Sequence, residues 1–294
     1  MSDASWPVVV TGASSGIGME TALHLASRGY QVCATMRDLS RRGALDAEAA
    51  RRKVDLLVEA LDVTDPASIE MRVRSLVGRY GGISGLVSNA GFQMRGYFED
   101  MTDAEIRSVF EVNLFGTMNV IRAVLPVMRA ARQGRIVIVS SVGGLLGSPA
   151  LSAYCASKHA LEGFGESLWL EGRALGIQVS LVEPAIVQTE IWRGNKRLAA
   201  AALSPTSPYR DWFLAEERLA DQVVATAPTT TVDVARAAHQ AFAARRPRLR
   251  YLVGRRAALL LLFRRYLPAA LFERLYFGEV IRRITAPRVK ASAR

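Results

Sequence analysis

Short apolar runs alternate with longer stretches of helical spacing along most of the chain. An apolar run over residues 8–10 precedes a glycine-rich turn, a helix with apolar side chains at Ile17, Ala22 and Leu25, and a second apolar run before Arg37. Further strand candidates lie in residues 54–63, 82–91, 134–144, 177–185 and 248–254, and helices are predicted over residues 103–112, 116–129 and 231–246. This alternation predicts an α/β fold, a single Rossmann-type doubly wound parallel sheet with helices on both faces and ligands at the carboxyl ends of the strands.

The regular pattern loosens after about residue 190. Residues 190–228 are rich in Ala, Pro and Ser with isolated aromatic residues, which favours a loop with short helices that covers a substrate, although an ordinary surface insertion also fits. A helix and a strand then complete the sheet. We therefore expect one sheet-forming domain over residues 1–253 and a helical C-terminal extension over residues 254–294.

The positive charge of the chain is concentrated at its C-terminal end. The formal net charge is +11, yet residues 245–294 carry 14 of the 38 Lys and Arg residues and 2 of the 27 Asp and Glu residues, so the preceding part is nearly neutral. A nucleic-acid-binding domain would carry its positive surface on the folded body, interleaved with aromatic residues for stacking. The charge distribution therefore argues against a nucleic-acid partner.

The C-terminal extension combines apolar runs with arginines. Its longest apolar run, residues 257–263, is far shorter than the roughly 20 residues that cross a bilayer. A basic amphipathic segment can instead lie on an anionic membrane surface. The alternative, which we favour, is that its leucines pack over the substrate pocket or a partner subunit while its arginines stay in water.

Two features bear on the compartment of the protein. No charged segment followed by an apolar run and a small-residue cleavage site precedes Val8, so we expect a cytoplasmic protein. The two cysteines, Cys33 and Cys155, lack the spacing of a disulfide framework or a metal site, and we expect reduced thiols and no bound metal.

The stretch TGASSGIG after the first strand carries the first candidate chemistry. Its glycines stand between a strand and a helix, where they allow a tight turn and the close approach of a pyrophosphate to the helix N-terminus. The spacing G-x-x-x-G-x-G differs from the common G-x-G-x-x-G fingerprint, and glycines at such a turn can also serve the turn alone. We interpret this stretch as a dinucleotide-binding turn made of Gly12, Ser14, Ser15, Gly16, Ile17 and Gly18.

Further motifs follow this turn in order: LDV at residues 61–63, NAG at 89–91, VNLFG at 112–116, IVSSVGG at 138–144 and YCASK at 154–158. With them the chain resembles the short-chain dehydrogenase/reductase family over roughly its first 190 residues. The resemblance implies that Asp62 and the N–H of Val63 contact adenine. It also implies that Asn89, Ala90 and Gly91 lie beside the adenine ribose, although an ordinary turn explains this tripeptide in isolation.

Tyr154 and Lys158 stand four residues apart, so on a helix their side chains share one face. A free phenol has a pKa of about 10, and a nearby ammonium favours the phenolate and lowers this value. The resemblance implies hydride transfer between nicotinamide and a carbonyl carbon: Tyr154 exchanges the proton with the oxygen, Ser141 hydrogen-bonds that oxygen, and Lys158 lowers the tyrosine pKa and binds the nicotinamide ribose. Asn113 would connect Lys158 to solvent through a water.

The family's Pro-Gly pair after the next strand is Pro184 and Ala185 in this chain. Alanine resists the positive φ that glycine tolerates, so the local backbone is expected to differ. The resemblance places Pro184, Val187 and Thr189 near the nicotinamide.

The end of the second strand bears on the choice of cofactor. An acidic side chain there would hydrogen-bond the ribose hydroxyls of NAD, but Met36 stands at that position and Arg37 follows. Arginine suits a phosphate dianion by charge and geometry, so we predict that NADP(H) is preferred over NAD(H). The alternative is that Arg37 is a solvated loop charge, and the neighbouring Asp38 argues for caution.

These observations predict an NADP(H)-dependent oxidoreductase that interconverts a ketone and a secondary alcohol. The stretches ATMRDL and RLRYLVG resemble the branch of the 17-beta-hydroxysteroid and retinol dehydrogenases, which implies a bulky apolar substrate such as a steroid, retinoid, lipid or polyketide-like compound. A biosynthetic ketoreductase for a specialised natural product fits equally well. The alternative from another class is a non-catalytic dinucleotide-binding or redox-sensing module.

The predicted helix that carries Tyr154 has a second stripe of mostly small side chains. The family often uses this helix for dimer contact, so a homodimer or homotetramer is expected, with packing inside the monomer as the alternative. The stripe comprises Ala153, Ala156, Ser157, Ala160, Gly163 and Phe164.

Overall fold

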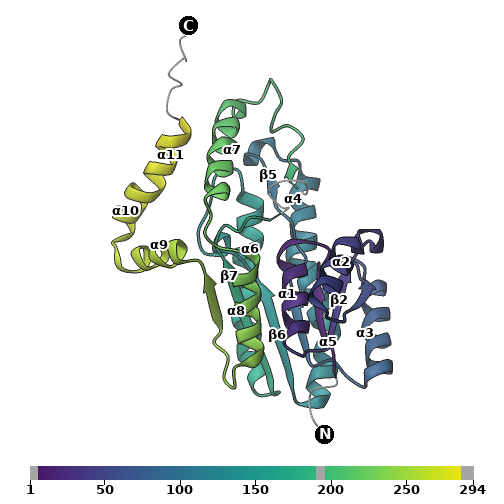
Figure 1. Cartoon of the computed structure of the whole chain (residues 1–294). Coiled ribbons are helices and arrows are strands. Elements are labelled where there is room, and N and C mark those ends of the chain that lie inside the picture. Colours follow the sequence, from purple (N-terminus) through teal and green to yellow (C-terminus); the bar gives the residue numbers. More distant parts are fainter. Residues whose placement is uncertain (1–5, 190–195, 286–294) are drawn as a thin grey trace.

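A sheet of seven parallel strands forms the centre of the protein, in the order β3-β2-β1-β4-β6-β7-β9 (Figure 1). The computed structural model describes residues 6–189 and 196–285. Chain order reverses between β1 and β4, which opens a crevice at the carboxyl ends of these strands. The predicted doubly wound parallel fold is confirmed. The strands are β1 (Val8–Thr11), β2 (Val32–Met36), β3 (Leu57–Ala60), β4 (Gly85–Ser88), β6 (Gly134–Val139), β7 (Ile177–Pro184) and β9 (Arg250–Val253).

Helices cover both faces of the sheet. Helices α1 (Gly16–Ser27), α2 (Gly43–Arg52) and α8 (Thr231–Ala243) pack on one face, and α3 (Pro66–Tyr80), α5 (Gly116–Ala131) and α6 (Ser152–Arg173) pack on the other. The strand β1 shows the reason for its unbroken apolar run. Val8 and Val10 belong to the first core and Val9 to the second, so every side chain of this central strand is buried.

Local sequence signals start several of these helices. Thr102 and Glu105 form a capping box at α4 (Asp103–Phe110), and Thr230 and Asp233 form another at α8. Each threonine hydroxyl accepts a hydrogen bond from a first-turn N–H, and the acidic side chain accepts one from the backbone of that threonine. Asp65 caps α3 in a similar way.

One five-residue π-helical segment, Glu111–Phe115, joins α4 to α5. A π segment disturbs the regular pairing of backbone groups and often marks a functional site. Its central residue, Asn113, is completely buried.

The region that the sequence predicts to be a loop with short helices contains one long helix, α7 (Arg210–Ala225), of 16 residues. A small parallel sheet of β5 (Met94–Arg95) and β8 (Arg197–Leu198) lies beside it. The buried Arg95 guanidinium forms ion pairs with Glu216 and Glu217 of α7 and so anchors this helix to the body. Residues 190–195 of the predicted loop lie outside the described residues.

The C-terminal extension forms an arm that leaves the sheet after β9 and runs beside α7 (Figure 1). It consists of α9 (Arg255–Tyr266), α10 (Ala269–Phe272), a π-helical turn (Glu273–Phe277) and α11 (Gly278–Thr285). Within α9 the one buried residue is Ala257, Leu260 and Leu261 are half-buried, and the remaining leucines and the arginines are exposed. Across residues 6–189 and 196–285, no helix combines the length and apolar character needed to cross a membrane.

Candidate active site

The predicted dinucleotide-binding turn has the backbone that its glycines require. Gly12 and Gly16 adopt φ values of +68° and +58°, which favour glycine. A Cβ at Gly18 would lie 2.3 Å from the carbonyl oxygen of Gly12, so the first turn of α1 packs directly on the loop. The Asn89 Nδ2 group donates hydrogen bonds to the Thr11 and Gly12 carbonyls at 3.0 and 3.2 Å. The Asn89 side chain therefore holds the turn in place.

A cleft of about 600 Å³ runs from this turn along the carboxyl edge of the sheet, a size typical of ligand and cofactor sites. The glycine backbones leave room for a phosphate at the N-terminus of α1. The cleft is lined by five basic and two acidic side chains. These residues fit a dinucleotide. The predicted residues that line the cleft are Gly12, Ser14, Ser15, Gly16, Ile17, Arg37, Asp62, Val63, Asn89, Ala90, Gly91, Tyr154, Lys158 and Thr189.

Three predicted cofactor residues lie elsewhere. Gly18 stands behind the turn against Gly12, whereas Pro184 and Val187 line a neighbouring cavity. Pro184 is the last residue of β7, and Val187 lies in the segment that follows this strand along the neighbouring cavity.

Basic side chains gather where the cleft passes the end of β2. Arg37 and Arg41 line it from one side, and Lys196 and Arg197 line it from the other. A hydrogen bond with the Ser40 side chain, followed by a 2.9 Å hydrogen bond from the Ser40 N–H, lowers the pKa of Asp38. This acidic side chain is therefore engaged in the local turn.

Sequence reasoning missed Arg41, Lys196 and Arg197. The Arg197 guanidinium stacks on the Phe92 ring at 4.0 Å, a contact between residues 105 positions apart that no local pattern reveals. The sequence did contain a signal for Arg41, because this second basic residue follows Arg37 by four positions after the same strand.

The adenine-side residues have internal roles as well. The Asp62 Oδ1 atom accepts hydrogen bonds from the Thr64 N–H at 2.9 Å and the Thr64 hydroxyl at 2.8 Å. Val63 packs against Gly116, where a Cβ would lie 2.6 Å from the valine methyl. The loop after β3 is thereby fixed along one wall of the cleft.

Lys158 projects from α6 onto the end of β6. Its Nζ atom donates a 2.9 Å hydrogen bond to the Val139 carbonyl and lies 5.9 Å from the centroid of the Tyr154 ring. Burial lowers the pKa of the Lys158 ammonium to about 8, while the negative charge of Glu162 raises it. Tyr154 and Lys158 therefore share one face of α6, as their spacing predicts.

Tyr154 has a pKa opposite in direction to the one expected from a nearby ammonium. Burial raises the pKa of Tyr154 to about 12, although a hydrogen bond to Ser141 lowers it. Ser141 also accepts a 3.0 Å hydrogen bond from the Gly143 N–H, which fixes its hydroxyl beside the phenol. At neutral pH the tyrosine is thus a protonated phenol and the lysine is charged.

Asn113 supports the helix that carries this pair. Its side chain exchanges 2.9 Å hydrogen bonds with the backbone N–H and carbonyl of Phe92 and donates to Ser157 at 3.1 Å. Ser157 in turn donates to the Tyr154 carbonyl at 2.7 Å. The side chain of Asn113 therefore positions the backbone at Tyr154.

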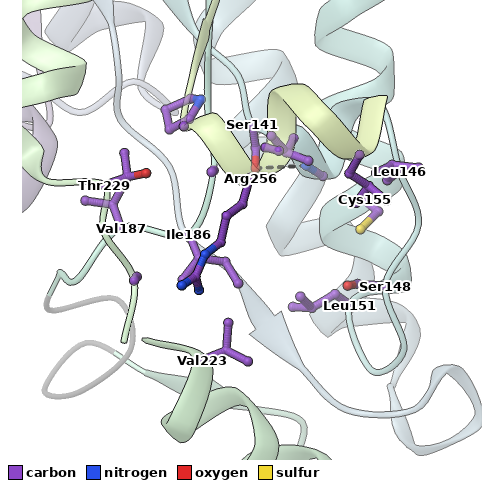
Figure 2. Close-up of a pocket in the computed structure, with 18 of the residues that line it drawn as sticks. Ser141, Leu146, Ser148, Leu151, Cys155, Ile186, Val187, Val223, Thr229 and Arg256 are labelled. Carbon is purple, nitrogen blue, oxygen red and sulfur yellow. Dashed lines mark hydrogen bonds between the residues drawn. The ribbon is translucent and has the colours of Figure 1, made fainter. Parts of the chain in front are cut away.

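A second cavity, of about 350 Å³, shares lining residues with the first, and Figure 2 shows residues that line this second cavity. Tyr154 lines both cavities. Most of its lining is apolar, from the turn after β6, from α6, from the segment after β7 and from α7. Sequence reasoning did not single out the residues of this cavity that come from the arm, Arg256, Ala257, Leu260 and Tyr276.

The Pro-Ala pair that ends β7 needs no unusual backbone. Ala185 does not adopt a positive φ, and its N–H donates a 2.8 Å hydrogen bond to the Val253 carbonyl. The close approach here is made instead by Gly254, with φ at +131° and a Cβ that would lie 2.6 Å from the Ala185 methyl. This glycine lets the arm begin directly beside the cavity.

A buried carboxyl pair lies one helical turn behind Lys158. Glu162 of α6 and Glu183 of β7 both lie 3.2 Å from the Arg250 guanidinium, and one oxygen of each has no hydrogen-bond partner among the described residues. Burial, followed by the charge of Glu162, raises the pKa of Glu183 to about 8. A proton on Glu183 would satisfy both oxygens.

With this geometry in place, comparison with known proteins identifies the family. A family model described as short chain dehydrogenase matches residues 7–198. The chain belongs to the short-chain dehydrogenase family. It is therefore an NAD(P)-dependent oxidoreductase.

Curated relatives of this enzyme include dehydrogenases with named activities. Retinol dehydrogenase 8 of Bos taurus is 39% identical over 261 residues, covering 85% of this chain and 82% of the relative. The human 17-beta-hydroxysteroid dehydrogenase type 1 is 41% identical over 190 residues, covering 62% of this chain and 57% of the relative.

Solved structures of similar shape include complexes with both cofactors. A Burkholderia phymatum short-chain dehydrogenase/reductase in complex with NAD has a TM-score of 0.76 and 26% identity, covering 98% of this chain and 99% of the other. A metagenomic short-chain oxidoreductase in complex with NADP has a TM-score of 0.67 and 27% identity, covering 85% of this chain and 97% of the other.

The buried carboxyl pair generates a prediction about stability. The pKa of Glu183 rises from 4.5 in its unperturbed state to about 8 in the folded enzyme, so between these values the folded state holds a proton that the unfolded state has released. Stability from this site is therefore lost as the pH rises. The Glu183→Gln variant, with a neutral amide, should gain thermal stability relative to the wild type from about pH 5 to about pH 8.

The measurement is the difference in melting temperature between variant and wild type along this pH range. Glu166→Gln is the matched control, because Glu166 also contacts Arg250 but its side chain is 57% exposed. A Glu183→Gln difference that stays constant with pH would contradict the buried proton.

Proposed function

We propose that this enzyme is an NADP(H)-dependent reductase that interconverts a ketone and a secondary alcohol on a bulky apolar substrate. The observation that carries the proposal is the position of Tyr154, whose side chain lines both the cleft that fits a dinucleotide and the apolar cavity beside it. A proton donor at this junction can serve a substrate in one cavity that receives hydride from a nicotinamide in the other.

The nicotinamide cofactor supplies the hydride when bound. Tyr154 is protonated at neutral pH, so its phenol can donate a proton to the carbonyl oxygen of the substrate. The Ser141 hydroxyl, fixed by the Gly143 N–H, can hydrogen-bond the same oxygen. Lys158 uses one N–H on the Val139 carbonyl and keeps two for the ribose hydroxyls of the cofactor.

Removal of the phenolic hydroxyl tests this function. Tyr154→Phe should reduce kcat by about 100-fold or more, because general acid catalysis contributes about that much, while NADPH still binds. The measurement is NADPH consumption with ketosteroids, retinal and apolar diketones, together with NADPH binding by fluorescence. Tyr80→Phe, at the end of α3 and in the lining of neither cavity, is the control and should retain turnover.

Two other outcomes have distinct meanings. If wild-type protein binds NADPH but reduces no ketone of the panel, the non-catalytic dinucleotide-binding module gains support, unless a specialised natural product outside the panel is turned over. If Tyr154→Phe retains wild-type kcat, the assignment of the proton donor is wrong.

The preference for NADP(H) rests on the basic end of the cleft. Arg37, Arg41 and Arg197 would neutralise a 2′-phosphate, and the Asp38 carboxylate is already engaged with Ser40. Arg37→Ala should weaken NADPH binding by about tenfold and leave NADH binding within about twofold, as expected for loss of one charged hydrogen-bonding partner. Equal losses for both cofactors, or none in comparison with the exposed control Arg122→Ala, would contradict the preference.

The substrate class follows from the cavity and from the relatives. Its lining is mainly apolar, and two relatives are named for dehydrogenation of retinol and of a hydroxysteroid. A biosynthetic ketoreductase would use the same cavity, and the substrate panel distinguishes the two.

The arm contributes Leu260 and Tyr276 to the lining of the apolar cavity, and we propose a further role for its outer side. Large side chains there face solvent: Leu259, Leu262 and Phe263 of α9 are each about half exposed, and Tyr266 is 72% exposed. Residues 255–285 also carry seven arginines and two glutamates. We propose that this surface contacts an anionic membrane, because apolar side chains flanked by arginines suit lipid acyl chains and headgroups. A second copy of the same surface would bring like charges together.

Vesicle binding tests this contact. Full-length protein should co-sediment with anionic vesicles at low salt and not with neutral phosphatidylcholine vesicles. Arg264→Gln with Arg265→Gln should weaken binding by about thirtyfold, given about 1 kcal/mol for each arginine at the surface. The matched control is Arg51→Gln with Arg122→Gln on the body. Absence of binding would overturn the contact.

Sedimentation without vesicles tests the proposed homodimer or homotetramer. In the small-residue stripe of α6, Ala153 and Ser157 are buried inside the monomer, whereas Ala156 and Gly163 are exposed. The exposed part of the stripe is available to a second subunit.

The cytoplasmic location of the enzyme stays a prediction.

A further inference from the structure

The apolar cavity beside Tyr154 has one charged side chain in its lining, as far as the described residues show, and it is Arg256. In Figure 2 this side chain extends from the start of α9 to a position between Val187 and Thr229 on one side and Leu151 and Ser148 on the other. Arg256 is itself exposed, so its guanidinium stands at the mouth of a space that is otherwise lined by neutral groups.

Arg256 is not engaged in a structural ion pair. No carboxylate of the described residues forms a salt bridge with it, in contrast to the arginines of α11, which pair with Glu279. A solvated guanidinium would be unremarkable on the outside of the arm, where Arg264 and Arg265 lie. Arg256 is exposed too, but it lines the cavity mouth, where a bound substrate can reach it.

The free energy of binding a substrate beside the Arg256 guanidinium depends on the chemistry of that substrate. An apolar neutral ligand that fills the cavity removes part of the water around the guanidinium and offers it no partner, which is unfavourable. A carboxylate or phosphate accepts two parallel hydrogen bonds from the planar guanidinium and compensates its charge. Among ligands with the same apolar body, an anionic one is therefore favoured.

We propose that the substrate of this enzyme is an amphiphilic oxo or hydroxy acid, an apolar molecule with an anionic group that binds Arg256. The inference rests on the proposed reductase function and narrows its substrate class. Tyr154 and Arg256 line the same cavity, so the apolar body spans from the reacting carbonyl to the guanidinium.

The charge of the arm acts in the same direction. Its excess of arginines attracts anions toward the side of the molecule where the cavity opens. The arm then determines specificity as well as covering the cavity. In a cavity of about 350 Å³, one charge at the mouth would also orient a bound acid.

Turnover of matched substrates tests the proposal. The probes are apolar oxo acids that differ in the distance between ketone and carboxylate, each with its neutral methyl ester and with a phosphate ester of the corresponding oxo alcohol. For at least one member, wild-type kcat/KM should be about tenfold or more higher for the anion than for the methyl ester, since a site built for a polar partner rejects the analogue that lacks it.

Variants of the arm test whether Arg256 causes the preference for anionic substrates. In Arg256→Gln the preference for the anion should fall to about twofold or less, and Arg256→Lys should restore part of it, because lysine keeps the charge but not the bidentate geometry. The matched control is Arg255→Gln, since both arginines are exposed on α9 and only Arg256 lines the cavity. Higher activity on the phosphate esters than on the acids identifies phosphate as the anion.

Ligand binding separates this proposal from the reductase function. The oxo acids should raise the melting temperature of wild type and Arg255→Gln but not of Arg256→Gln, whether or not turnover occurs. If wild type reduces neutral ketones with no preference for acids, or if Arg256→Gln keeps the preference, the inference is overturned and the reductase function stands. If no ketone is reduced, the reductase function fails. An Arg256-dependent rise in melting temperature then still supports an anion site, and its absence overturns that site.

Discussion

The close packing of α6 on β7 is the constraint on which the site depends. A Cβ at Gly165 would lie 2.8 Å from a Leu181 methyl, and one at Gly172 would lie 2.8 Å from the Ile177 carbonyl oxygen, so the helix approaches the sheet more closely than larger residues would allow. At this distance the Lys158 ammonium reaches the Val139 carbonyl, although it is nearly buried. A lysine is kept charged in such a place by its hydrogen bond and by Glu162.

The same packing gives Tyr154 its two surroundings. The phenol stands where the parallel strands end, between a polar cleft and an apolar cavity, and burial keeps it protonated. Asn113 and Ser157 hold the backbone at this position through hydrogen bonds. The arm lines one side of the apolar cavity with neutral residues, places the exposed Arg256 at its mouth, and presents other large apolar residues to solvent.

Much of the fold and of the site was predictable from the sequence, for local reasons. The capping residues Thr230 and Asp233 mark the start of α8, and the apolar run at β1 reflects burial on both faces. The glycines of the first turn adopt the predicted backbone, and Tyr154 and Lys158 share a face because helical spacing requires it. The long helix α7 was not predicted, since its ion pairs to Arg95 depend on residues more than 100 positions away.

The sequence by itself determined the family, the parallel sheet and the spacing of the reactive side chains, because each depends on residues close together along the chain. The tertiary structure alone decided the direction of the Tyr154 pKa, the carboxyl pair of Glu162 and Glu183, and the place of Arg256 at the cavity mouth. The physical reason is that burial and electrostatic contact depend on elements brought together in space. No pattern near Arg256 distinguishes it from Arg255, yet one lines the cavity and the other does not.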